Sequence, residues 1–340
     1  MKRSEFLKKC VVLTAGSLIA GQSMARQITG PAVPGAVEPV AAGKLDGLSG
    51  LSGQADAATA AETVTILYTN DTHARLDPFP DNAVEYAGLG GISRRATLVK
   101  KIRRGSPHTL LLDAGDVFQG TPWFNVFGGE KDLKLMSQMG YDAICLGNHE
   151  FDNGLDGFAD VAPAADFPIL CANYRVDGTP MAPFVEPFIV REVAGLRFGI
   201  FGLGIRLDGV VRPELYGDVE YLDPVRWARG MAESLRGYHR CDYIICLSHL
   251  GYHYDDERID DRKLASQTNG IDLVIGGHTH TFMDQPEAIR TPDGNSTLVT
   301  QAGHSGINLG RVDLQFDEFG RISQTLAHQY TIGARDHVAG

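Results

Sequence analysis

Residues 63–73 read TVTILYTNDTH, and this stretch decides the fold class. It begins with β-branched and apolar residues over the length of a strand and ends in polar residues. The same arrangement, an apolar strand with a polar end, occurs at four further places in the 340-residue chain. Segments with helical periodicity separate these strands. We therefore expect an α/β domain whose polar residues gather at strand ends.

Ten segments have strand-like patterns and five have helical periodicity. The segment FIVREVAGLRFGIFGLG (188–204) is typical of a hairpin that turns at Ala194-Gly195, which predicts mixed sheets. One α/β domain is expected over residues 62–335. Its strands are predicted at 64–69, 109–113, 142–146, 168–172, 187–193, 196–203, 242–248, 272–276, 297–301 and 309–316, and its helices at 91–104, 130–139, 154–164, 224–237 and 257–268.

The N-terminal residues have the features of an export signal. Basic residues at positions 2, 3, 8 and 9 precede the apolar run CVVLTAGSLIAG, and Ser23-Met24-Ala25 fits a cleavage site between small residues. The apolar run is too short to span a bilayer. We therefore expect residues 1–25 to be a signal peptide and the mature protein to be exported, with the periplasm as its compartment.

Residues 26–61 are rich in Gly, Ala, Pro and Ser and contain no aromatic residue. Such a segment buries too little apolar surface to offset the entropy of ordering, so we expect a flexible tether. The formal net charge of the chain is −11 at pH 7. Because nucleic-acid backbones are bound by clustered Lys and Arg, this charge argues against a nucleic-acid polymer as partner.

Five apolar strands end in residues with metal-binding side chains. In open α/β sheets ligands bind at the carboxyl ends of the strands, so these residues are expected to meet at one edge. Taken singly, each has an ordinary explanation: Asp71 could cap the next segment, and Asn148 could satisfy a turn. The five ends together favour a functional site. The residues are Asp71, His73, Asp116, Asn148, His149, His249, His278 and His280.

The donor set combines oxygen and nitrogen ligands and contains no thiolate. It exceeds what one tetrahedral zinc ion needs and suits two divalent ions that share a carboxylate. Mn, Zn, Fe and Co all accept mixed His, Asp and Asn ligands, so the identity of the metals stays open. The seven expected ligands are Asp71, His73, Asp116, Asn148, His249, His278 and His280.

These motifs resemble those of the calcineurin-like metallophosphoesterases. The series consists of DTH (71–73), GD (115–116), GNHEFD (147–152), SH (248–249) and GGHTH (276–280), in that order. Within this family the chain is similar to the catalytic domain of bacterial 5'-nucleotidases and 2',3'-cyclic nucleotide phosphodiesterases. The resemblance implies a four-layer αββα sandwich with two mixed β-sheets.

The resemblance also implies how the ligands are shared between the ions. One metal would be held by Asp71, His73, Asp116 and His280, and the other by Asp116, Asn148, His249 and His278. Asp116 would then bridge the ions. A hydroxide held between them would attack phosphorus, since two cations lower its pKa and neutralise the charge that spreads over the phosphoryl oxygens.

Two residues of the third motif have catalytic roles by the same resemblance. His149 would stabilise a phosphoryl oxygen or protonate the leaving alkoxide, and Asp152 would orient His149 and keep it protonated. The offset of three residues between them suits one helical turn. Glu150 is expected to support the turn and the following helix N-terminus instead of reacting.

Three further residues are weaker candidates for the substrate pocket. His304 in QAGHSGINLGR would line the pocket near the metals, and Trp123 and Phe124 in GTPWFN would either stack a nucleotide base or pack in the core. Full-length 5'-nucleotidases of this family carry a second domain that binds the nucleotide. This chain stops at Gly340, so a separate chain with such a domain is an expected partner.

The resulting hypothesis is a two-metal hydrolase of phosphate esters, most similar to 5'-nucleotidases, with a nucleotide as substrate. One alternative is a weakly active dimetal-binding module that needs a separate nucleotide-binding chain, and another is a cyclic nucleotide phosphodiesterase. A two-metal peptidase is disfavoured because Asn148 with His149 fits phosphoryl chemistry better.

Overall fold

The stretch TVTILYT forms strand β1 (Thr63–Thr69), as the sequence predicts. The computed structural model describes residues 62–317 and 319–333, which belong to a unit that extends from Ala61 to Gly340. The predicted signal peptide (1–25) and tether (26–61) lie outside the described residues. In β1, Val64, Ile66 and Tyr68 contribute to one core cluster and Leu67 to another, as the alternating side chains of a strand require.

The first sheet has seven strands in the order β15-β14-β1-β2-β3-β4-β6. β1 to β4 and β6 run parallel to one another, and β14 pairs antiparallel with β1 and with β15. The strands other than β1 are β2 (Thr109–Asp113), β3 (Ala143–Cys145), β4 (Ile169–Leu170), β6 (Val185–Glu186), β14 (Asn308–Phe316) and β15 (Ile322–Thr331).

The second sheet has six strands in the order β12-β13-β11-β10-β8-β7. Its inner strands are parallel and its two edge strands are antiparallel to their neighbours. The predicted hairpin is confirmed: β7 and β8 join through Ala194 (φ 53°) and Gly195 (φ 73°), the positive angles of a tight hairpin turn. The strands are β7 (Phe188–Val193), β8 (Leu196–Leu203), β10 (Tyr243–Ser248), β11 (Leu273–Gly276), β12 (Glu287–Arg290) and β13 (Ser296–Thr300).

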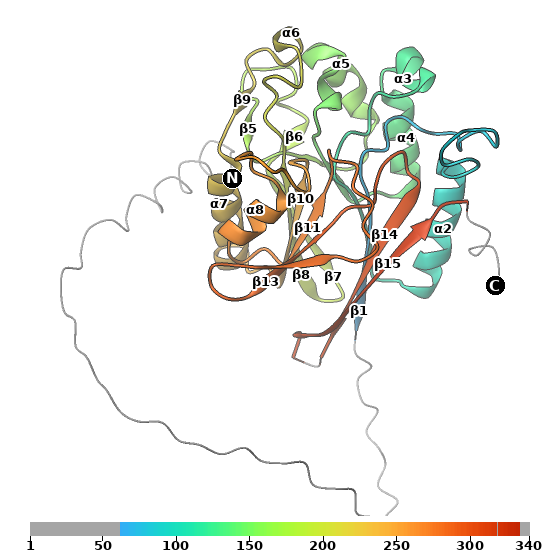
Figure 1. Cartoon of the computed structure of the whole chain (residues 1–340). Coiled ribbons are helices and arrows are strands. Elements are labelled where there is room, and N and C mark those ends of the chain that lie inside the picture. The colour runs from blue at the N-terminus through green and yellow to red at the C-terminus, as the bar shows by residue number, and fades with distance from the viewer. Residues whose placement is uncertain (1–61, 318, 334–340) are drawn as a thin grey trace, which may run out of the picture. The chain divides into compact units, whose positions relative to one another are not determined.

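Helices cover the outer faces of both sheets (Figure 1). On the first sheet lie α2 (Ile92–Gly105), α4 (Glu130–Met139) and α5 (Gly154–Val161), and on the second α7 (Pro224–Gly237) and α8 (Asp261–Gln267). The shorter elements are α3 (Pro122–Phe127), α6 (Pro213–Tyr216), the 3₁₀ turns η1 (His149–Phe151) and η2 (Ala162–Ala164), and a two-stranded sheet of β5 (Tyr174–Arg175) and β9 (Glu220–Tyr221).

Buried layers between the sheets and between sheets and helices hold this arrangement together. One lies between the two sheets, where Ile66 and Leu112 of the first sheet join the cluster of Ile200 and Ile245 of the second. Another lies between the first sheet and its helices, where Leu67 belongs to the same cluster as the residues of α2 and α4. Burying one such side chain stabilises the fold by about 1.5–3 kcal/mol. The predicted αββα sandwich with two mixed sheets is confirmed.

The structure differs from the sequence predictions mainly at element ends and edges. The helix predicted at 257–268 begins only at Asp261, because the Asp260 side chain caps it by accepting the N–H of Lys263 at 2.7 Å. Strand β15 was not predicted, since most of its residues are polar and it is exposed apart from a partly buried C-terminal end. It exists by pairing with β14 along its length.

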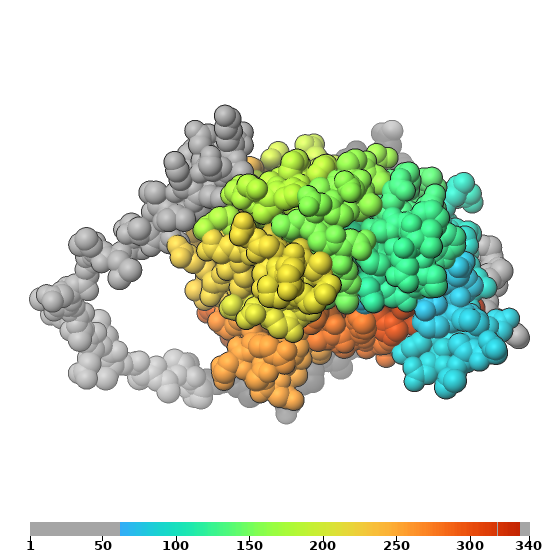
Figure 2. All heavy atoms as spheres, turned by 90° about the horizontal axis from the view of Figure 1, so that it is seen from above, coloured from blue at the N-terminus to red at the C-terminus, as the bar shows by residue number. Residues whose placement is uncertain are grey.

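The carboxyl ends of the parallel strands in both sheets point to one edge of the sandwich, at the top of Figure 1. Seen from above (Figure 2), the green residues of α3 to α5, the yellow residues near α6 and the orange residues after β10 meet on this face. Within the described part of the chain, no helix has the length and apolar character needed to cross a bilayer.

Candidate metal centre

The polar residues at the strand ends have an unusual backbone conformation. Asp71, His73, Asp116, His278 and His280 all have φ between 50° and 69°, in the left-handed region that residues with a side chain rarely occupy. Each such residue costs of order 1–3 kcal/mol and persists only where its surroundings impose it. Here the loops impose it on one another, since the Asp71 N–H donates to Gly115 O and the His73 N–H to Asp116 O. Strain of this kind concentrates at functional sites.

The first group of facing side chains consists of Asp71, His73 and His280. The Nε2 atoms of the two histidines lie 2.9 Å apart, and Asp71 Oδ1 lies 3.3 Å from His280 Nε2 and 3.9 Å from His73 Nε2. The other ring nitrogen of His73, Nδ1, is 3.2 Å from the carbonyl oxygen of Phe118. A proton on Nδ1 leaves Nε2 as a lone-pair donor directed at the centre of the group.

The second group consists of Asp116, His249 and His278, with Asn148 beside it. His249 Nε2 lies 3.0 Å from Asp116 Oδ2, and His278 Nδ1 lies 2.9 Å from Asn148 Oδ1. His249 is buried, and its Nδ1 lies 2.7 Å from Ala114 O, as a donor to that carbonyl would. This contact fixes the ring so that Nε2 faces Asp116.

Asp116 belongs to both sides of the centre. It forms one facing group with His249 and His278, and another with His73 and His149. Burial raises its pKa, but the His249 ring close to it outweighs burial and holds the pKa well below the usual range of a carboxyl group. Asp116 is therefore an ionised carboxylate between two sets of histidines.

The electrostatics of the centre favour a cation. Burial lowers the pKa of His249, but the charges of Asp116 and Asp71 outweigh it and raise the pKa to about 10. Burial and the charge of His249 together lower the pKa of His278 to about 4, so His278 stays neutral. A positive charge is thus stabilised between the two carboxylates, whether a proton or a metal ion carries it.

His149 and Asp152 form a pair at the rim of the centre. Residues 149–151 form the turn η1, which brings His149 Nδ1 to 2.8 Å from Asp152 Oδ2. Burial lowers the pKa of His149, but the hydrogen bond with Asp152 and the charge of Asp116 outweigh it and raise the pKa to about 9. The ring lies 5.2 Å from that of His73. A protonated imidazole therefore faces the space next to the first group.

Residues 64–282 match the family described as calcineurin-like phosphoesterases. The chain belongs to this family. A snake venom 5'-nucleotidase of Gloydius brevicauda is 36% identical over 280 residues, which cover 76% of this chain and 46% of that protein. The trifunctional nucleotide phosphoesterase YfkN of Bacillus subtilis is 34% identical over 306 residues, 81% of this chain and 19% of YfkN.

This calcineurin-like phosphoesterase is also similar to a solved structure of a 5'-nucleotidase. The 5'-nucleotidase precursor of Thermus thermophilus is 32% identical, with a TM-score of 0.72, and the match covers 79% of this chain and 54% of that one. The chain spans about half the length of the first curated relatives it matches. The predicted family and fold class are confirmed.

The residues of this calcineurin-like phosphoesterase fit divalent metal ions. His249 Nε2 is buried and, among the described residues, has no hydrogen-bond partner, although Asp116 Oδ2 lies 3.0 Å away. Two lone pairs at that separation satisfy each other only through a shared cation. The Nε2 atoms of His73 and His280 also face each other, 2.9 Å apart, so that either a hydrogen bond between the two rings or a shared metal ion can occupy this position. Nitrogen and carboxylate donors at such spacings suit zinc and similar ions.

Glu150 has a larger role than the sequence predicted. It is buried, and its carboxylate accepts four backbone N–H groups: Gly147 at 2.6 Å, Asp116 at 3.0 Å, Val117 at 2.8 Å and Phe118 at 3.3 Å. Burial and the charge of Asp116 raise its pKa to about 7. Glu150 therefore ties the loop after β3 to the loop after β2, whereas the sequence suggested only local support.

Replacing Glu150 with alanine should lower the free energy of unfolding by about 3 kcal/mol or more. The reason is that each buried N–H left without an acceptor costs about 1–3 kcal/mol. Urea unfolding of the metal-free protein measures the change, with the exposed Glu233→Ala as the matched control, expected within about 0.5 kcal/mol of wild type. Equal midpoints for both variants would show that these bonds do not hold the loops.

Two positioning residues were missed by the sequence reasoning. Asn70 donates to Asp71 Oδ2 at 2.7 Å and to Gly303 O at 2.6 Å, and its Oδ1 accepts the N–H of Ala302. Gln301 donates to Gly277 O at 2.7 Å and accepts the N–H of Thr281 at 3.0 Å. Asn70 directly precedes Asp71 in TVTILYTNDTH (63–73), so its position in the sequence could have identified it. Nothing in the sequence near Gln301 marks it.

Two glycines of the motifs are required by close approach. A Cβ on Gly147 would lie 2.2 Å from Asp116 Oδ1, and one on Gly277 would lie 2.8 Å from His249 Nδ1. Both distances are far shorter than real Cβ contacts. These glycines allow the strand-end loops to reach the centre.

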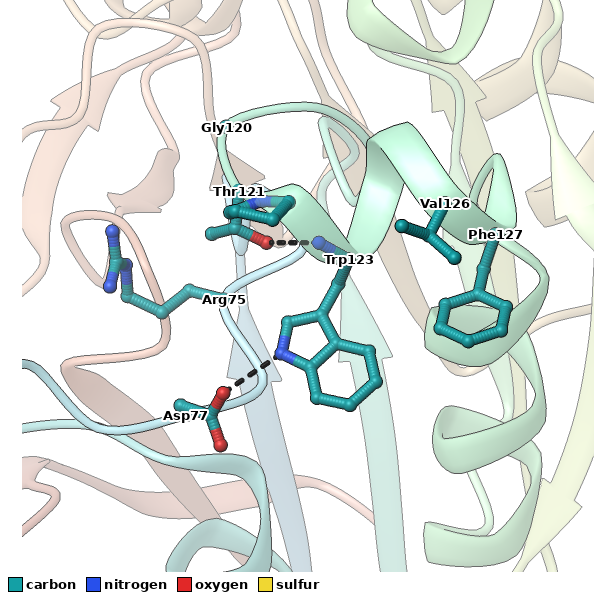
Figure 3. Close-up of a pocket in the computed structure, with 8 residues that line it drawn as sticks. Arg75, Asp77, Gly120, Thr121, Trp123, Val126 and Phe127 are labelled. Atoms are coloured by element: carbon teal, nitrogen blue, oxygen red, sulfur yellow. Dashed lines mark hydrogen bonds between the residues drawn. The ribbon is translucent and has the colours of Figure 1, made fainter.

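The weaker candidates have separate outcomes. His304 stacks on His280 with ring centroids 5.0 Å apart, so it does lie beside the centre. Phe124 is only 7% exposed and packs on Phe118, so of its two predicted roles it has the one in the core. Trp123 instead lines a surface pocket together with Phe127 (Figure 3).

Proposed function

We propose that this chain is a two-metal phosphomonoesterase with a 5'-nucleotidase-like activity. The observation that carries the proposal is the position of Asp116, which faces His249 and His278 on one side and His73 on the other. In the proposed assignment Asp71, His73, Asp116 and His280 hold one ion, and Asp116, Asn148, His249 and His278 hold the other. Relatives named 5'-nucleotidases support a nucleotide as substrate.

The chemistry divides between the ions and the side chains. Two divalent ions, when bound, activate a water molecule and neutralise the phosphoryl charge. His149 carries a proton at neutral pH and donates it to the leaving alkoxide or to a phosphoryl oxygen. Asp152, at 2.8 Å from His149, orients the ring and stabilises its charged form. Asn148 contributes a neutral oxygen, which limits the negative charge that the substrate meets.

Other parts of the hypothesis stay predictions. A 2',3'-cyclic nucleotide phosphodiesterase is the second candidate, favoured by the similarity to YfkN, which is named a trifunctional nucleotide phosphoesterase and not a 5'-nucleotidase alone. A separate chain with a nucleotide-binding domain finds no support in the comparisons. The metals, the export of the protein to the periplasm and the domain limits 62–335 are likewise predictions.

The wild-type protein, loaded with Mn²⁺ or Zn²⁺, should hydrolyse AMP and p-nitrophenyl phosphate, and EDTA should abolish both activities. The phosphodiester 2',3'-cyclic AMP should react more slowly than the monoester AMP, because the proposed activity is that of a phosphomonoesterase. The measurement is kcat/KM for the three substrates. A preference for the cyclic diester would replace this proposal with the phosphodiesterase. A metal-loaded protein inert to all three would favour the partner-dependent module.

A further inference from the structure

Asp261 is a fully buried acid at the first residue of helix α8. An acid in the first turn of a helix ordinarily stabilises the positive end of the helix from the surface. The neighbouring Asp260 already caps α8, because its side chain accepts the N–H of Lys263 at 2.7 Å. Burying an acid costs free energy unless its oxygens are hydrogen-bonded. The position of Asp261 therefore requires a reason other than the start of the helix.

The carboxyl group of Asp261 contacts the ends of two neighbouring strands of the second sheet. Ser248, the last residue of β10, donates through Oγ to Asp261 Oδ1. Gly276, the last residue of β11, is so close that an added Cβ would lie 2.0 Å from Asp261 Oδ2. His249 follows Ser248 directly, and His278 lies two residues after the end of β11. One carboxyl group is thus packed against both segments that carry the histidines of the second group.

Gln301 extends this connection along the GGHTH loop (276–280). Its Nε2 donates to Gly277 O at 2.7 Å and, more weakly, to Asp261 Oδ2 at 3.4 Å. Its Oε1 accepts the N–H of Thr281 at 3.0 Å. The side-chain amide of Gln301 therefore holds the loop on both sides of its two histidines, and the carboxyl group of Asp261 lies next to this amide.

The loop after β10 is also bonded directly to its neighbours. The Asp261 N–H donates to Gly251 O at 2.8 Å. One residue further along the same loop, the Tyr252 N–H donates to Thr279 Oγ1 at 2.9 Å. The two histidine rings of the second group lie with their centroids 5.4 Å apart. Their spacing depends on how these two loops meet, and Asp261 lies at the junction.

We propose that Asp261 is a positioning residue that holds His249 and His278 at the spacing required by one of the two metal ions. The inference rests on the proposed function, because it assumes that these two histidines share an ion. The second ion is the one assigned to Asp116, Asn148, His249 and His278, and the first is the one assigned to Asp71, His73, Asp116 and His280.

The contacts of Asp261 predict an effect on the second ion alone. Asp71 and His73, which belong to the first ion, follow β1 in the other sheet. Asn70 holds Asp71 from that side by donating to its Oδ2 at 2.7 Å. Loss of Asp261 leaves these contacts in place. It should therefore weaken binding of the second ion and spare the first.

Binding of Co²⁺ to the metal-free protein, followed by its visible absorption, tests the two sites separately. His73→Ala removes a proposed ligand of the first ion only, and His249→Ala removes one of the second ion only. In the His73→Ala protein, adding Asp261→Ala should raise the Kd for Co²⁺ about tenfold or more, the usual scale for loss of a group that orients a metal ligand. In the His249→Ala protein the same substitution should leave the Kd unchanged.

Asp272→Ala is the matched control, because Asp272 joins the same two strands at their opposite ends. Asp272 precedes β11, and its Oδ2 accepts the N–H of Ile244 in β10 at 2.6 Å. Its replacement should leave the Co²⁺ affinity unchanged in both proteins. Asp261→Asn keeps an oxygen that can accept from Ser248, so it should fold as wild type does by circular dichroism. Its rise in Kd should be smaller than that of Asp261→Ala and confined to the same site.

The possible outcomes separate this inference from the proposed function. A selective loss of affinity in the His73→Ala protein, with the fold intact, supports the positioning role. An equal rise in Kd in both proteins, or no rise in either, would show that Asp261 supports only the fold and would overturn the role. Wild-type protein that binds a single Co²⁺ ion would contradict the proposed two-metal site itself and the inference with it.

Discussion

Asp116→Asn should lose both metal ions and nearly all phosphatase activity. The carboxylate faces histidines of both groups, so its replacement by a neutral amide weakens two sites at once. Loss of an outer partner of a metal ligand typically costs 10- to 100-fold in affinity or activity, and loss of a shared ligand should exceed about 100-fold. Metal content by mass spectrometry and kcat/KM with p-nitrophenyl phosphate measure the two effects.

The control for Asp116→Asn is Asp160→Asn, an exposed carboxylate on α5. It makes the same chemical change without touching the centre and should retain wild-type metal content and rate. Circular dichroism of both variants separates loss of metal from loss of fold. An Asp116→Asn protein that keeps two ions and reacts at the wild-type rate would remove Asp116 from the bridging position.

The location of the centre could be predicted because the fold places it by a general rule. Asp71, Asp116 and His249 each follow an apolar strand, and parallel strands end at the same edge of an α/β sheet. Local periodicity was sufficient for those strands. It was insufficient for β15, whose residues are mostly exposed and which is held only by its pairing with β14.

The contacts that hold the centre together could not be predicted in the same way. Glu150 binds N–H groups of the loop after β2, more than thirty residues earlier, and no local pattern reports such a contact. Gln301 reaches the GGHTH loop from the end of β13 in the same manner. Phe124 and Phe127 are both phenylalanines of α3. The direction of each side chain decides that Phe124 is buried in the core and that Phe127 lines a surface pocket. Tertiary packing, and not sequence spacing, sets all three.

The loops that carry the metal-binding side chains have a strained backbone. This strain explains why additional hydrogen bonds hold the loops in place. Asp71 and His73 hold left-handed φ angles of 51° and 50°, which the chain would relax if it were free. The bonds from Asn70 and the packing of Gly120 on His73 prevent this relaxation. The donors are therefore preorganised before an ion arrives, which reduces the entropy lost on metal binding.

His149→Ala should retain the metal ions and lower kcat for AMP by about 10²- to 10⁴-fold, the usual contribution of a general acid. The side chain is absent from the proposed ligand set, and its pKa of about 9 keeps it protonated at neutral pH. Its ring lies 5.2 Å from that of His73, so its proton faces the proposed metal site. Asp152→Asn removes only the partner at 2.8 Å, so it should give a smaller loss in the same direction.

The leaving group distinguishes the two roles open to His149. p-Nitrophenolate leaves without a proton, so a general acid matters less for p-nitrophenyl phosphate than for AMP, whose alkoxide must be protonated. If His149 protonates the leaving oxygen, the variant should lose much more activity with AMP than with p-nitrophenyl phosphate. Equal losses would instead assign His149 to a phosphoryl oxygen, where its charge serves every substrate alike. A variant with reduced metal content would contradict both roles and place His149 among the ligands, since it faces Asp116 and His73.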